Sequence, residues 1–220
     1  RWFGVENLST IWVVWSPPHL VLFGTLIAGI LKALPLIKRD SEPARLLFGS
    51  YAWGCILIMA AVVVAPFYPF GPYHIWGFVG AGVLAATLIG ILLLAARHNI
   101  FGATFAGMMF ISLYFLHAAS SVASWVSIPP FTNPPPFTIF FSVIAPAVLI
   151  DSKIIPWWIE GALAGLFYGV FLFVFTSPFL EPMFRYSLQD AATAISACIV
   201  GGVLAGLIVN ISTQSWRMRK

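Results

Sequence analysis

"TAISACIVGGVLAGLIVNIS" (residues 193–212) is a run of twenty residues without a single charged side chain. The hydrocarbon core of a bilayer is about 30 Å thick, and a helix of about 20 apolar residues crosses it. A closed β-barrel instead uses alternating strands of about 10 residues. The stretch therefore predicts a membrane-spanning α-helix. Similar apolar runs precede it, and we expect spans at about 18–37, 46–67, 77–96, 100–120, 137–150, 155–176 and 193–211.

The composition supports the same fold class. Hydrophobic residues make up 60% of the chain and charged residues 8%, with a mean hydropathy of +0.97. A soluble domain carries roughly 25% charged residues, because its surface faces water. We therefore predict an all-α, polytopic membrane helical bundle of about seven transmembrane helices. It forms one transmembrane domain over residues 1–220, with residues 1–16 as an external or interfacial segment, and Pro146 predicts a tilt or kink in the short fifth span.

The basic residues predict how the bundle is oriented. If the spans alternate in direction, nine of the eleven basic residues lie on one side of the membrane: Lys32, Lys38, Arg39, Arg45, Arg97, Lys153, Arg217, Arg219 and Lys220. Arg1 and Arg185 lie on the other side. Because cytoplasmic loops carry an excess of lysine and arginine, we expect an external N-terminus and a cytoplasmic C-terminus. The net charge of +4 thus reports topology and not a nucleic-acid partner.

The first span begins in an unusual way, at Ser16, Pro17, Pro18 and His19. Serine is a favoured N-cap, and proline is favoured in the first turn of a helix, where its missing N–H leaves no bond unmade. Ser16, which follows Trp15, directly precedes Pro17 and so disfavours continuation of the helix backwards. The pattern predicts a helix that starts here and holds His19 in its first turn, at the external boundary of the membrane.

Three histidines are expected at the external face: His19, His74 and His117. Only His98 falls on the cytoplasmic side. Imidazoles are common ligands of copper, zinc and iron, so His19, His74 and His117 are candidate metal ligands if they meet in the plane of the membrane. The alternative is that each is an ordinary hydrogen-bonded residue of the interface.

Other polar and small residues inside the spans favour structural roles. Glu160 lies near the cytoplasmic end of the sixth span, where it can snorkel or pair with Lys153, and Lys32 can reach the same interface from the first span. Cys55 and Cys198 are expected to be packing residues. Glycines repeat every four residues in the last two spans, which predicts close helix contacts within the chain or with another subunit: Gly161, Gly165 and Gly169, then Gly202 and Gly206.

The segment "WSPPHLVLF" (15–23) resembles the C subunit of the copper membrane monooxygenases, which oxidise methane or ammonia. In that family a histidine opens a transmembrane helix in a Thr-Pro-Ala-His-type segment, and His19 matches it. "PYHIWGFVGAGVLAATL" (72–88) is similar to a family stretch in which a histidine precedes a helix. The family's Asp-x-x-x-His motif has no counterpart between Arg1 and His19. The resemblance implies that His19 is a copper ligand.

Two functional hypotheses follow. The first is a membrane subunit of a multi-subunit redox or oxygenase complex, with an external copper site at His19 together with His74 or His117. If enzymatic, it would be a component of a metal-dependent monooxygenase or oxidoreductase. The second is a non-catalytic accessory or scaffold subunit that binds partner subunits, lipids or pigments. Either belongs in a prokaryotic cell membrane or a related energy-transducing membrane. The 193–212 stretch has no lysine for a retinal Schiff base, which excludes a microbial rhodopsin.

Overall fold

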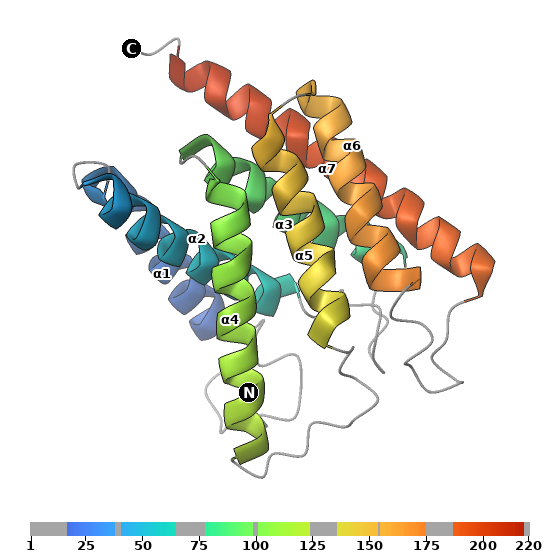
Figure 1. Cartoon of the computed structure of the whole chain (residues 1–220), viewed down its shortest axis with the longest axis horizontal. Coiled ribbons are helices and arrows are strands. Elements are labelled where there is room, and N and C mark those ends of the chain that lie inside the picture. The colour runs from blue at the N-terminus through green and yellow to red at the C-terminus, as the bar shows by residue number, and fades with distance from the viewer. Residues whose placement is uncertain are drawn as a thin grey trace.

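The computed structural model describes residues 17–37, 41–64, 78–98, 101–123, 136–153, 155–174 and 187–217, and these ranges contain helices and no strand. Figure 1 shows the helices as a bundle. The elements are α1 (Pro17–Ile37), α2 (Glu42–Val64), α3 (Phe78–His98), α4 (Gly102–Ala123), α5 (Pro136–Ser152), α6 (Trp157–Gly169), the π-helical turn η4 (Val170–Val174) and α7 (Leu188–Arg217). The prediction of an all-α fold is confirmed for this part of the chain.

Over the residues that the structure describes, five helices are long and apolar enough to cross a membrane, which supports an integral membrane protein. Their spans are Pro18–Leu36, Glu42–Ala60, Val79–Arg97, Trp157–Val174 and Leu188–Thr213. The predicted fourth and fifth spans overlap α4 and α5, and the parts of these two helices whose side chains are described, Gly102–Leu113 and Phe141–Ser152, are apolar. Pro146, expected within the fifth span, lies inside α5. Five of the seven predicted spans are thus supported by length and apolarity over the described residues, and the total of seven stays a prediction.

Helix α7 extends well beyond the predicted span at 193–211. It covers 30 residues and begins five residues earlier, at Leu188. A reciprocal cap explains this start. The backbone N–H of Asp190 donates to Ser187 Oγ at 3.1 Å, while that hydroxyl donates to Asp190 Oδ2 at 2.6 Å. The serine oxygen thus satisfies one of the free N–H groups of the first turn, and the carboxylate holds the serine hydroxyl in place.

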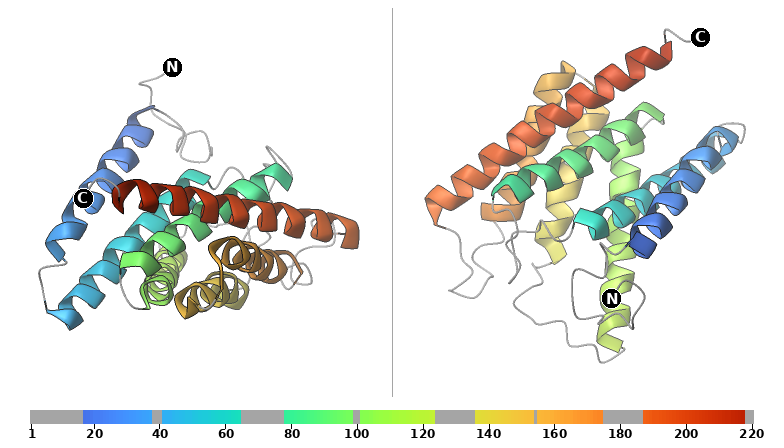
Figure 2. Two further views of the ribbon diagram at one scale, coloured as in Figure 1. Left: turned by 90° about the horizontal axis from the view of Figure 1, so that it is seen from above. Right: turned by 180° about the vertical axis from the view of Figure 1, so that it is seen from behind.

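The tightest packing lies where α7 runs along α3 and α6 (Figure 2). Neighbouring glycines of α7 serve the two contacts, because a Cβ on Gly201 would overlap the carbonyl oxygen of Gly82 in α3. A Cβ on Gly202 would overlap that of Gly161 in α6. In lipid, helices associate through close van der Waals packing, which small residues permit. The predicted role of the α6 and α7 glycines in helix packing is confirmed.

Cys198 completes this core. Its side chain is fully buried, and its Sγ donates to the carbonyl oxygen of Ala81 in α3 at 3.6 Å. On the other side of α7, a Cβ on Gly165 of α6 would overlap the carbonyl oxygen of Cys198 itself. The prediction that Cys198 is a packing residue is confirmed.

Helix α1 lies at the edge of the bundle, with α2 as its principal neighbour (Figure 2). Among the residues of α1 whose exposure is described, Leu34 is the only buried one, and several apolar side chains are open, with Val21 64% exposed. Only 6% of the span Pro18–Leu36 is buried. An isolated helix that is hydrophobic all round is stable in lipid, so α1 needs no burial within the chain to remain helical.

Candidate functional site

His19 lies where the sequence predicts, in the first turn of α1, which begins at Pro17. Its imidazole is half-buried and lies beside Phe23, one turn further along, with ring centroids 6.4 Å apart and planes tilted by 34°. The two prolines set the backbone for this turn, since their fixed φ suits a helix start. Ser16, the predicted N-cap, lies outside the described residues.

The structure does not describe the side chains of the other two candidate ligands. His74 lies outside the described residues, and of His117 the structure describes only the backbone, in the last two turns of α4. Over the residues whose positions are described, no three histidine, cysteine or acidic side chains gather where they could hold a metal ion. Those residues alone therefore supply no complete copper site around His19. A site shared by His19, His74 and His117 stays a prediction.

The opposite end of the bundle carries a polar cluster that joins helix ends. Arg97, in the last turn of α3, donates from Nη1 to the carbonyl oxygen of Val209 at 2.6 Å and to Thr213 Oγ1 at 2.8 Å. Both acceptors belong to α7. Charge-assisted hydrogen bonds are stronger than neutral ones, so Arg97 fixes the end of α3 against α7.

Asp151 plays the same role between α5 and α4. Its carboxylate accepts hydrogen bonds from the backbone N–H groups of Ala103 at 3.2 Å and Thr104 at 2.7 Å, in the first turn of α4. These N–H groups have no partner within their own helix, and the negative charge also suits the positive end of the helix dipole. Asp151 thus caps a helix from a distance of 47 residues along the chain.

Glu160 lies in the first turn of α6 and is buried, with 9% of its surface exposed. Arg97 and Lys153 act on it as the nearby positive charges, and Asp151 as the nearby negative charge. Of the two expected roles of Glu160, its electrostatic interaction with Lys153 supports the pairing, and its burial does not support snorkelling. Lys153 itself is exposed and adopts a left-handed backbone with φ of 51°. The cluster thus brings two basic and two acidic side chains to one end of the bundle.

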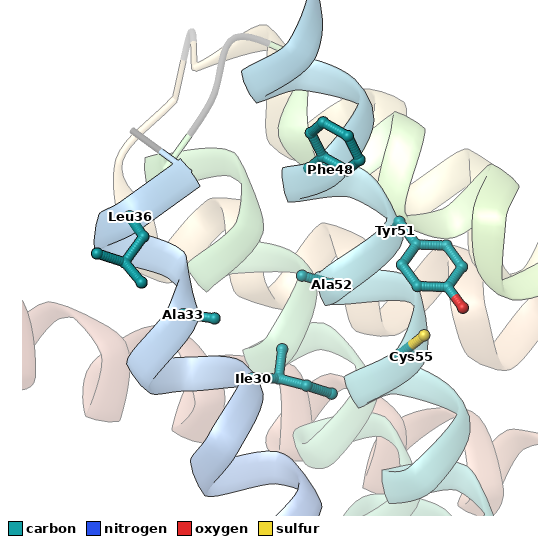
Figure 3. A pocket seen from close by; sticks show the side chains of 7 residues that line it. All are labelled: Ile30, Ala33, Leu36, Phe48, Tyr51, Ala52 and Cys55. Atoms are coloured by element: carbon teal, nitrogen blue, oxygen red, sulfur yellow. The ribbon is translucent and has the colours of Figure 1, made fainter. Parts of the chain in front are cut away.

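An apolar groove of about 440 Å³ opens between α1 and α2 (Figure 3). Its walls are Ile30, Ala33 and Leu36 from α1 and Phe48, Tyr51, Ala52 and Cys55 from α2. The Tyr51 hydroxyl and the Cys55 thiol face each other on the α2 side, one turn apart. Cys55 is half-buried here and not enclosed like Cys198, so its predicted role as a packing residue holds only in part. The groove offers no cluster of reactive groups.

The outer face of α1 is the feature that the sequence reasoning missed. We define it by five residues that are all exposed: Gly24, Thr25, Ala28, Gly29 and Lys32. The opposite side of the helix packs toward α2 through Phe23, Ile27, Ile30 and Leu34, which are half-buried or buried. Spacing was the available signal, because Gly24 and Ala28, like Thr25 and Gly29, are small residues four positions apart.

Comparison with known protein families, with curated proteins and with solved structures finds no match to this chain.

Proposed function

We propose that this chain is a non-catalytic, integral membrane subunit of a multi-subunit complex and that it binds a partner subunit through the outer face of α1. One observation carries the proposal. Helix α1 is long enough to span the bilayer, yet 6% of its span is buried, against 39% to 56% for the four other candidate spans. A subunit that assembles with others is expected to keep one helix with its contact face open.

The proposal includes seven transmembrane helices, an external N-terminus and a cytoplasmic C-terminus. The distribution of charge supports the orientation. Arg97 and Lys153 both lie at the end of the bundle where Thr213 and the close of α7 are found, and the cluster around Glu160 contains their charges. Basic residues collected at one end favour that end as the cytoplasmic one. The membrane would be a prokaryotic cell membrane or a related energy-transducing membrane.

A redox or oxygenase complex with copper near His19 is the second candidate. It is supported by the resemblance of residues 15–23 and by the position of His19, half-buried in the first turn of a helix whose start is set by proline. A metal ligand benefits from such a fixed backbone. His74, His117 or a residue of another subunit would have to complete the site.

Site-specific photo-crosslinking in native membranes tests the first proposal. A photoreactive residue replaces Val21 on α1 or, as the matched control, Val200 on α7, which are 64% and 59% exposed. We expect a protein adduct of discrete mass at Val21 and only lipid adducts at Val200. Lipid adducts alone at both positions would refute a partner at α1.

Metal analysis tests the second candidate. Copper is measured in the purified protein and in a His19→Ala variant, with His98→Ala, at the end of α3, as the control. Stoichiometric copper that is lost only in His19→Ala would support the site. A protein that binds no copper in any of the three forms would rule it out.

A further inference from the structure

The groove between α1 and α2 runs along the two helices. On α1 its wall extends from Ile30 to Leu36 and on α2 from Phe48 to Cys55, which is about 10 Å of helix in each case. Figure 3 shows Leu36 and Phe48 toward the end where the chain passes from α1 to α2, with Ile30 and Cys55 further from it. Because both helices are long and apolar enough to cross a membrane, the groove follows the direction of the lipid acyl chains.

The walls of this groove are apolar and open. Leu36, Phe48 and Tyr51 are 62%, 52% and 52% exposed, so the described part of the chain leaves them uncovered. Ala33 and Ala52 are small and point toward each other from the two helices, which leaves space between them (Figure 3). The volume of about 440 Å³ is within the range of ligand sites, roughly 300–1,000 Å³. Such a space in a bilayer is filled by hydrocarbon.

Two basic residues flank the end of the groove where the two helices connect. Arg45 is half-buried in the first turn of α2, three residues before Phe48, and therefore lies on the same side of that helix. Lys32 is exposed on α1, one turn before Leu36 and in the same row. It lies five residues, about 8 Å, before the end of α1 at Ile37, so its long side chain reaches the interface.

The charge around this end is positive. Residues 32–45 contain four basic and two acidic side chains. Glu42 lies six residues before Phe48, which places it about 120° around α2 from this wall of the groove. Lys38, Arg39 and Asp40 lie outside the described residues, and the site does not depend on them. The basic residues predict that this end is cytoplasmic, where anionic lipids attract basic side chains.

The length of the groove and the position of its charges decide between possible occupants. A helix that crosses the bilayer extends over about 30 Å, whereas the groove covers about a third of that length and has its basic residues at one end. An acyl chain with a phosphate at its head matches both features. A zwitterionic headgroup brings a positive charge of its own and gains less from two cations, so the charges favour an anionic lipid.

We propose that the groove between α1 and α2 binds one acyl chain of an anionic phospholipid, whose phosphate is held by Arg45 and Lys32. Guanidinium and ammonium groups donate charge-assisted hydrogen bonds to phosphate oxygens. This inference goes beyond the proposed function and does not require a partner subunit, because the groove and both basic residues belong to this chain.

Photoactivatable lipids test the inference on the purified full chain. Phosphatidylglycerol or phosphatidylcholine with a diazirine in one acyl chain is added at the same low fraction to phosphatidylcholine nanodiscs. Mass spectrometry then compares the adducts on residues 30–36 and 48–55. We expect at least about fivefold more adducts with phosphatidylglycerol, the effect of one basic residue near a membrane surface.

Charge variants show whether the two basic residues cause this preference. Arg45→Gln and Lys32→Gln should each lower the ratio of phosphatidylglycerol to phosphatidylcholine adducts, and the double variant should bring it close to one. Lys153→Gln is the matched control, because it removes an exposed lysine that follows α5 and lies outside the groove. It should leave the ratio unchanged.

A third substitution tests the groove itself. Ala33→Phe fills the space between the helices and should remove the adducts of both lipids from the two segments. Ala28→Phe adds the same side chain to the exposed outer face of α1 and should leave the adducts in place. The melting temperature of each variant reports whether the fold is retained, and Lys32→Gln, at an exposed position, tests the charge without disturbing the packing.

Three results would overturn the inference. The first is equal labelling of the wild-type chain by the two lipids. The second is a preference for phosphatidylglycerol that persists in the double variant of Arg45 and Lys32. The third is a disulfide between the Cys55 residues of two copies, which would place a second chain at the groove. None of these results bears on the crosslink expected at Val21 in native membranes, so the two proposals fail separately.

Discussion

Helices α7 and α1 are both long and apolar enough to cross a membrane and both carry small residues at intervals of four, but their surroundings are opposite. Gly201 and Gly202 of α7 lie against the backbones of α3 and α6, while Gly24 and Gly29 of α1 face open space. Small-residue spacing therefore indicates a helix contact, but it does not tell whether the contacting helix belongs to the same chain. In α7 the chain supplies both partners, and in α1 we infer that another protein supplies one.

The largest expected effect is a difference between two identical substitutions. Gly202→Ala places a Cβ on the carbonyl oxygen of Gly161, so helix α7 must move away from α6. We expect the free energy of unfolding to fall by about 3 kcal/mol, at the upper end of the cost of overpacking. Gly29→Ala meets open space and should leave stability unchanged or raise it by up to about 1 kcal/mol. Unfolding in a mixed detergent titration measures both.

Equal losses of unfolding free energy in the two variants would contradict the difference between a packed α7 and an open α1. A small loss in Gly202→Ala, below about 0.5 kcal/mol, would show that the α6–α7 contact has room to adjust and is not the core of the fold.

A smaller effect is expected at the polar helix ends. Asp151→Ala removes the acceptor for the N–H groups of Ala103 and Thr104 and should destabilise the chain by about 1 to 2 kcal/mol. Asp190→Ala leaves Ser187 Oγ as the acceptor for the backbone N–H of residue 190 and removes only the exposed carboxylate to which that hydroxyl donates, so it should cost about half as much or less. Thermal unfolding of the two variants measures the difference, and a costlier Asp190→Ala would contradict it.

The two cysteines provide a probe that leaves stability untouched. Cys55 borders the groove between α1 and α2, whereas Cys198 is fully buried between α7, α6 and α3. A membrane-permeant maleimide should modify Cys55 in the folded protein and Cys198 only after denaturation. Mass spectrometry of tryptic peptides reports both sites. Prompt labelling of Cys198 would show that the core opens readily, and a protected Cys55 would show that α1 closes the groove.

The fold could be predicted from the sequence where hydrophobicity alone decides. Each predicted span overlaps a helix, and the glycines of the last two spans predicted a contact that Gly161 and Gly202 make. The early start of α7 was missed because its first turn is polar, although Ser187 and Asp190 have the spacing of a capping pair.

The candidate sites depend on arrangement in the plane of the membrane, which hydrophobic runs do not encode. The sequence places Glu160 near one end of its span, but its burial beside Arg97 follows from how α3, α6 and α7 pack. Likewise, nothing in the pattern of Gly24 and Ala28 distinguishes them from Gly161 and Gly165. Only the position of α1 at the edge of the bundle shows that its outer face is open.

The assembly state of a double variant, Gly24→Leu with Gly29→Leu, tests the central claim most directly. Blue-native electrophoresis of mildly solubilised native membranes reports the size of the complex, and thermal unfolding of the purified chain reports its stability. We predict that the wild-type chain migrates in a larger complex, whereas the variant migrates alone with an unchanged melting temperature. A variant that stays in the complex, or a wild-type chain that migrates alone, would contradict the claim that α1 is a binding surface for another subunit.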